Sequence, residues 1–201
     1  MRPRKSIDVL VVLAHHEAGH AVLSAAINEA PQLVSIAEDA TSLGHTTQRM
    51  VARPSALAQV YLAGFAAEHL LTGRRPRQLD QEIGFSMLAR QDPKLLEAFN
   101  GSEQHDGHRA VTEVLRFANP RSDSETFSEI NRLYDASRES LSSVWTVVRR
   151  VAGALAEAGS LNRDQLFAVI GCFDIYGPVS AVQAREESPS VRLMRARSPV
   201  R

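Results

Sequence analysis

The chain of 201 residues contains a single cysteine, Cys172, which excludes an internal disulfide and a CxxC zinc ribbon. It also has no excess of charge, because 23 Lys and Arg residues balance 23 Asp and Glu residues. We therefore do not expect the strongly basic surface that is typical of nucleic-acid binding. The sequence has no Walker A motif, GxxxxGK followed by Ser or Thr, so we expect no nucleotide ligand. Any metal site must be built mainly from histidines and carboxylates.

Long apolar runs are absent as well, and no stretch of about 18 consecutive apolar residues predicts a membrane anchor. Three basic residues precede a short apolar run at residues 9–14, as they do in a signal peptide. However, Asp8 interrupts the start of that run, and His15 and His16 follow it in place of a cleavage site. We therefore expect a cytoplasmic protein.

The pattern of apolar residues predicts a mainly helical fold with a small β portion. Residues 7–28 lack proline and are rich in Ala, Leu and Val, which favours a buried helix. A second apolar helix is expected to begin at Pro54 and to stop at Gly73. Residues 33–38 and 43–48 flank a glycine-containing turn and predict a β-hairpin or two strands of a sheet. Further helices are expected over 80–90, 102–118, 122–159 (one helix or a pair) and 162–170.

The composition changes near the C-terminus. Residues 176–201 are rich in Arg, Ser and Pro, which predicts a basic, flexible tail. We therefore assign residues 1–175 to one domain and the remainder to the tail.

The most informative segment is AHHEAGHAV at residues 14–22, because it contains an HExxH motif formed by His16, Glu17 and His20. Residues four apart lie on one face of a helix, so both imidazoles can bind one metal ion. The glutamate beside the first histidine can then act as the base that accepts a proton from water. The motif predicts one Zn²⁺ ion and a hydrolase.

Two histidines make an incomplete zinc site, and the sequence leaves the third ligand open. The extended motif HExxHxxGxxH would need histidine at position 26, where this chain has Ala26. The remaining candidates are acids and histidines farther along the chain, and their spacing does not choose among them. They are Glu68, His69, Glu82, His105, Asp106 and His108.

The segment AHHEAGHAV resembles the HEAGHA segment of the peptidase domain of the FtsH family, which are membrane-anchored, ATP-dependent zinc proteases. Three later segments, LVSIAEDATSLGHTTQ, VYLAGFAAEHLLTG and HDGHRAVTEVLRFA, are similar to segments of that domain in the same order. The resemblance covers residues of about 10–171. No segment of these 201 residues resembles the family's ATPase module or its membrane anchor, so we expect a freestanding peptidase domain.

The resemblance also implies roles for single residues. It carries the family's two histidine ligands onto His16 and His20, its catalytic glutamate onto Glu17, and its aspartate ligand onto Asp106. Glu68 matches a glutamate of the family's second helix, where it would orient a metal ligand or simply carry a charge at a helix end.

These features together predict a zinc metallopeptidase that hydrolyses peptide bonds in unfolded or extended polypeptides. We expect the strand LVSIAE to align substrate by strand addition, with Val34, Ser35, Ile36, Gly44 and His45 as the substrate-binding residues. The alternative is a noncatalytic, zinc-stabilised protein-interaction module of the same fold, and hydrolysis of a nonpeptide amide also stays open. A homo-oligomer would follow only by analogy with the family's rings.

Overall fold

The computed structural model describes residues 8–27, 30–36, 45–47, 53–92, 94–95 and 105–171. These residues form a mainly helical domain with a small antiparallel sheet, as the sequence predicts. The elements in chain order are α1 (Val9–Ala26), β1 (Leu33–Ser35), β2 (His45–Thr47), α2 (Pro54–Thr72), α3 (Arg77–Ala89), α5 (Asp106–Ala118), α6 (Asp123–Ser143), α7 (Trp145–Ala158), β3 (Ser160–Asn162) and α8 (Arg163–Ile170).

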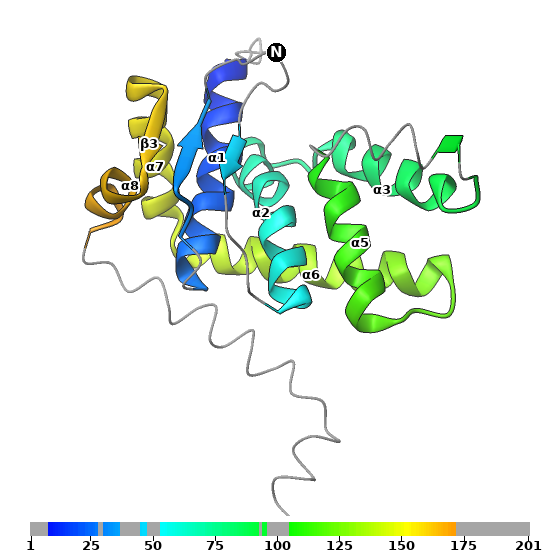
Figure 1. Ribbon diagram of the computed structural model, residues 1–201. Helices are drawn as coiled ribbons and strands as arrows, with labels where there is room; N and C mark the ends of the chain where they lie inside the picture. The colour runs from blue at the N-terminus through cyan, green and yellow to red at the C-terminus, as the bar shows by residue number, and fades with distance from the viewer. Residues whose placement is uncertain are drawn as a thin grey trace, which may run out of the picture.

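Helix α2 is the centre of the fold and packs against α1, α5 and α6 (Figure 1). It begins with Pro54 in its first turn, where the missing amide hydrogen costs nothing. It ends at Gly73, whose φ of 71° is in the left-handed region that favours glycine. Most of its side chains are buried, which explains why its sequence is apolar on nearly every face.

Helices α1 and α2 approach each other closely at Gly19. A Cβ atom at this position would lie 2.5 Å from the backbone oxygen of Ala63 and 2.8 Å from the Cβ of Ala67. Glycine is unfavourable inside a helix by roughly 1 kcal/mol relative to alanine. The close contact between the two backbones accounts for its presence here.

The sheet has the strand order β2-β1-β3, so β1 is the central strand. It pairs antiparallel with β2, where Val34 lies opposite Thr46, and antiparallel with β3, where Val34 lies opposite Leu161. The β1–β2 pair matches the expected hairpin. The sequence did not indicate β3, which follows directly after the turn at Gly159.

The C-terminal half is a set of helices that cover α1 and α2. The predicted helix over 122–159 is a pair, because the chain breaks between α6 and α7 at Val144. Helix α8 begins with a capping box in which the side chains of Asn162 and Gln165 bond to each other's backbone N–H groups. The expected start of α5 at Ser102 lies outside the described residues, which resume at His105.

Helix α1 is long and apolar enough to cross a membrane by length and composition. Most of the helix is buried inside the protein, and every residue from Glu17 to Ala26 is buried. A buried core helix and a signal sequence both pass the same test, so this property alone is weak evidence. The predicted tail, Gly44 and Cys172 lie outside the described residues.

Candidate metal centre

The buried half of α1 carries the HExxH motif. His16 and His20 lie one helical turn apart, and the centroids of their rings are 4.7 Å from each other. His20 is 5% exposed and Glu17 is 5% exposed, so the motif faces the interior and not the solvent. The ring of Phe65 on α2 packs edge-on against His16 at 5.2 Å.

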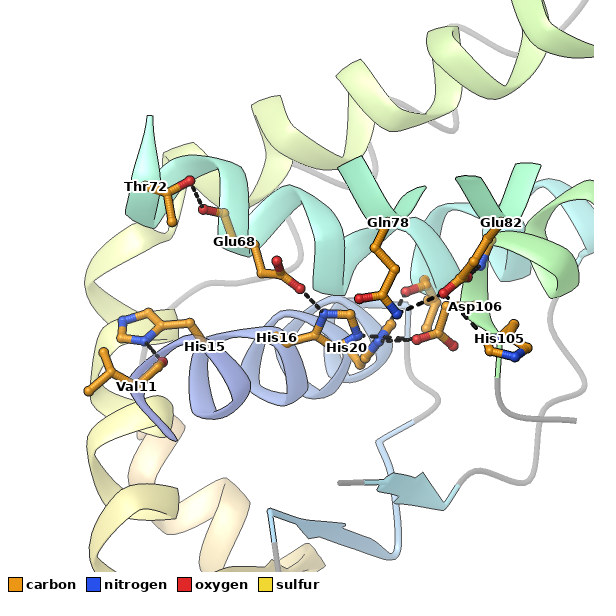
Figure 2. Close-up of polar contacts among 12 residues, drawn as sticks. Val11, His15, His16, His20, Glu68, Thr72, Gln78, Glu82, His105 and Asp106 are labelled. Carbon is orange, nitrogen blue, oxygen red and sulfur yellow. Dashed lines mark hydrogen bonds and ion pairs between the residues drawn. The ribbon is translucent and has the colours of Figure 1, made fainter. Parts of the chain in front are cut away.

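The first turn of α5 brings Asp106 to the two histidines. Its Oδ2 atom lies 3.2 Å from Nε2 of His16 and 3.0 Å from Nε2 of His20 (Figure 2). These three residues are the one group of metal-binding side chains found in the described part of the chain, with ligand atoms within 4.8 Å of one another. The structure therefore brings Asp106 to the two histidines, which lie 90 and 86 residues before it in the sequence.

The opposite nitrogen of each imidazole is held by α2. Nδ1 of His20 lies 2.7 Å from the backbone oxygen of Val60, and Nδ1 of His16 lies 2.6 Å from Oε1 of Glu68. A backbone oxygen can only accept a hydrogen bond, and so can an ionised carboxylate. Both Nδ1 atoms must therefore carry the proton, which leaves Nε2 of a neutral histidine as an acceptor.

This arrangement places three acceptor atoms against one another, namely the two Nε2 atoms and Oδ2 of Asp106. Three acceptors repel unless a proton or a cation lies among them. A divalent metal ion satisfies all three at once, and the imidazole and carboxylate donor set suits zinc. Tetrahedral zinc at about 2.05 Å from each ligand separates ligand atoms by roughly 3.3 Å, close to the distances from Asp106.

The pKa values of the three side chains also indicate that this site favours a positive charge. Burial by itself lowers the pKa of His16 and His20, but the carboxylates of Asp106 and Glu68 outweigh it at His16 and raise that pKa well above its usual value. Asp106 likewise raises the pKa of His20. Burial would raise the pKa of Asp106, yet the two histidines hold it far below its usual range. The site is thus a strong centre for a positive charge, whether proton or metal.

Helix α2 leaves space for the two imidazoles at Gly64. A Cβ atom built there would lie 2.4 Å from Nε2 of His16 and 2.5 Å from Nε2 of His20. Any side chain at this position would therefore collide with the metal-binding nitrogens. Val60, Gly64 and Glu68 are spaced four apart, so one stripe of α2 forms the wall behind both histidines.

Glu17 lies next to His16 in sequence and is buried, whereas His16 is half-buried. Its charge acts on both imidazoles and contributes to the raised pKa of His16 and of His20. This negative charge beside the imidazoles is consistent with the proton-accepting role that the motif predicts.

The other candidate ligands do not reach this centre. Glu82 contacts the backbone N–H of Gly107 behind Asp106, and Nδ1 of His105 lies 3.4 Å from Glu82. Nδ1 of His108 lies 3.0 Å from the hydroxyl of Ser86. Nδ1 of His69 lies 2.8 Å from the hydroxyl of Tyr134 on α6.

The structure contradicts the prediction that residues 34–36 form a substrate-binding strand edge. Val34, Ser35 and Ile36 are buried, and β1 pairs on both of its sides, so it offers no free edge for strand addition. The backbone N–H of Ile36 is also used, because it donates to the oxygen of Gly159 at 2.9 Å. His45 begins β2, which lies at the edge of the sheet in the described part of the chain.

Two parts of the site were missed by sequence reasoning. The backbone oxygen of Val60 carries no signal in the sequence. Gly64 does carry one, because glycine in the interior of a strong helix usually has a packing reason. Its spacing to Glu68 marks the face that the histidines contact.

Comparison with known proteins does not assign this chain to a family. No family model matches the chain, and no curated protein matches it significantly.

Proposed function

We propose that this protein is a zinc-dependent endopeptidase of the FtsH-like type, acting on unfolded or extended polypeptides. The observation that supports this most is the meeting of two imidazole Nε2 atoms and one carboxylate oxygen beside the buried Glu17. This set leaves a tetrahedral metal ion one position for water or substrate, which is typical of catalytic zinc sites.

His16, His20 and Asp106 would hold the ion. When bound, zinc supplies a Lewis acid that polarises a carbonyl and makes water more acidic. Glu17 accepts the proton of the attacking water on its carboxylate and passes it to the leaving nitrogen. Glu68 and the backbone oxygen of Val60 fix the direction of the imidazoles by accepting their Nδ1–H groups.

An extended substrate is consistent with the sheet, because a peptide can add to a free strand edge through backbone hydrogen bonds. The structure makes β2 the better candidate for this role, since β1 is already paired on both sides. β2 contacts α1, the helix that carries the motif. We therefore propose that substrate aligns along β2, the strand that begins at His45, and not along residues 34–36.

The decisive experiment is the substitution Glu17→Gln in zinc-loaded protein, with cleavage of an unfolded substrate such as casein as the readout. Loss of a general base costs on the order of 100-fold or more in rate, while the three ligands remain and zinc content should stay stoichiometric. Glu129→Gln is the matched control, because Glu129 forms an ion pair with Arg132 on α6, away from the site. Activity of Glu17→Gln within tenfold of the parent protein would reject Glu17 as the base.

The second candidate is a noncatalytic module in which zinc only stabilises the fold. It is favoured by one observation, that the three ligands come from α1 and α5 while α2 holds both imidazoles, so a bound ion would tie three helices together. Bound zinc without any cleavage, together with a rise in melting temperature on metal addition, would support this candidate instead.

A further inference from the structure

Glu82 on α3 is a buried carboxylate that takes no part in the proposed metal set. It is 7% exposed, and its oxygens accept hydrogen bonds from the backbone N–H of Gly107 at 2.8 Å and from the side-chain amide of Gln78 at 2.9 Å. A third polar atom, Nδ1 of His105, lies 3.4 Å away. Figure 2 shows Glu82 directly beside the residue that completes the metal centre, Asp106.

The start of α5 depends on this contact. The residue before the helix is His105, and its side chain makes no capping hydrogen bond. The first N–H groups of a helix have no partner within the helix, and a buried N–H without a partner is costly. Glu82 supplies the missing acceptor from another helix, and its negative charge is favourable at a helix N-terminus.

The contact between Gly107 and Glu82 is also too close to admit a side chain at position 107. A Cβ atom at Gly107 would lie 2.7 Å from the Cβ of Glu82 and 2.8 Å from its Oε2. The absence of a side chain at Gly107 thus lets the backbone of α5 approach the side chain of Glu82 closely. The anchored N–H belongs to the residue directly after Asp106, so the position of Asp106 follows that of Glu82.

We propose that Glu82 is a positioning residue, which sets the place of Asp106 and thereby the affinity and geometry of the metal centre. The proposal rests on the proposed function only in requiring that Asp106 bind the metal. Glu82 acts through the backbone of α5 and does not touch the ion. Gln78 in turn orients Glu82 through its side-chain amide.

The test is titration of the metal-free full chain with zinc in competition with a fluorescent indicator. Glu82→Ala removes the acceptor and should weaken zinc binding by about 10 to 100-fold, as other residues that support metal ligands do. Glu82→Gln keeps an oxygen that can accept from Gly107 and should lose less than that range. Rescue by glutamine separates positioning from a need for the negative charge.

A double-mutant cycle shows whether Glu82 acts through Asp106. Asp106→Ala alone should weaken zinc binding, and adding Glu82→Ala to it should cause no further loss, because the ligand to be positioned is gone. An undiminished effect of Glu82→Ala in the Asp106→Ala background would overturn the proposal. So would parental affinity of Glu82→Ala when Asp106→Ala binds weakly.

The outcomes distinguish this proposal from the proposed function. If Asp106→Ala itself binds zinc as the parent does, Asp106 is not a ligand and the proposal for Glu82 fails, whereas the proposed peptidase activity is tested separately by the cleavage assay of Glu17→Gln. A second variant covers the case in which Glu82→Ala does not fold. Gly107→Ala removes no polar group, but its added carbon would displace the Glu82 side chain, so it should weaken zinc binding in the same range. Gly84→Ala on α3 is the control, because a Cβ atom there meets nothing within 4 Å, and it should leave zinc binding unchanged.

Discussion

The substitution Gly64→Ala tests the metal centre with a single methyl group. The added carbon would lie 2.4 Å from Nε2 of His16 and 2.5 Å from Nε2 of His20, whereas ordinary contacts begin at 3.4 Å. The nitrogens, or the backbone of α2, must therefore shift by about 1 Å. Metal sites tolerate deviations of only about 0.2 Å in ligand distance, so the shift exceeds the tolerance several times.

We expect Gly64→Ala to weaken zinc binding by about 100-fold or more, beyond the range seen when residues that only support ligands are removed. The effect on stability should be smaller, because two effects oppose each other. Alanine is favoured over glycine inside a helix by roughly 1 kcal/mol. Overpacking a buried site costs about 1 to 3 kcal/mol.

The assay is zinc titration of each metal-free variant, with thermal unfolding measured in parallel to show that the variant folds. Gly153→Ala on α7 is the matched control, because a Cβ atom there meets nothing within 4 Å. It should keep parental zinc affinity and gain up to about 1 kcal/mol of stability. A folded Gly64→Ala protein that binds zinc within tenfold of the parent would refute the assignment of the two Nε2 atoms as ligands.

Two further predictions concern the ligands and the pH dependence of stability. We expect zinc binding to be abolished by His16→Ala and by His20→Ala, and to be weakened at least about tenfold by Asp106→Ala. His108→Ala is the control and should leave zinc binding unchanged. If Asp106→Ala binds zinc as the parent does and His108→Ala does not, the site is a three-histidine one. Burial raises the pKa of Tyr134 from 10.0 to about 12, so the neutral phenol stabilises the fold fully below pH 10, and this contribution is lost as the pH rises towards 12. The free energy of unfolding of Tyr134→Phe, measured in urea, should therefore fall less steeply over this pH range than that of the parent. Equal slopes for the two proteins would contradict a raised pKa of Tyr134 in the folded state.

Sequence reasoning was most successful where the signal is local. Apolar composition and the terminal residues Pro54 and Gly73 predicted α2 to within a residue, because a helix of 19 residues with a proline start and a glycine stop has few alternatives. The same reasoning predicted α1 and the hairpin of β1 and β2. All of these depend on residues close together in the chain.

It failed where a feature depends on distant contacts. Strand β3 has three residues and pairs with β1 from the other end of the domain, so no alternation of apolar residues is long enough to reveal it. For the same reason the sequence suggested residues 34–36 as a free strand edge. The edge was already occupied by residues 160–162.

The choice of the third ligand shows the same limit. Spacing left six acids and histidines open, and the resemblance alone pointed to Asp106. What selects Asp106 in the structure is the place of the α5 N-terminus, which follows from the contact of Gly107 with Glu82. Glu82 itself was a candidate ligand in the sequence, and the structure turns it away from the histidines to the backbone behind Asp106.

The face of α2 towards α1 gives a physical reason why these parts form one site. One stripe of α2 meets the two histidines. The backbone oxygen of Val60 accepts from His20, the carboxylate of Glu68 accepts from His16, and Gly64 between them has no side chain that would collide with the imidazoles. Because α1 also carries Gly19 against the backbone of Ala63, the helices come close enough for the Val60 oxygen to reach His20. A larger residue at position 19 or 64 would separate the helices or fill the gap, and in either case the imidazoles would lose the hydrogen bonds that direct Nε2 towards Asp106. The small residues of the two helices are therefore as much a part of the metal centre as the residues that would bind the ion.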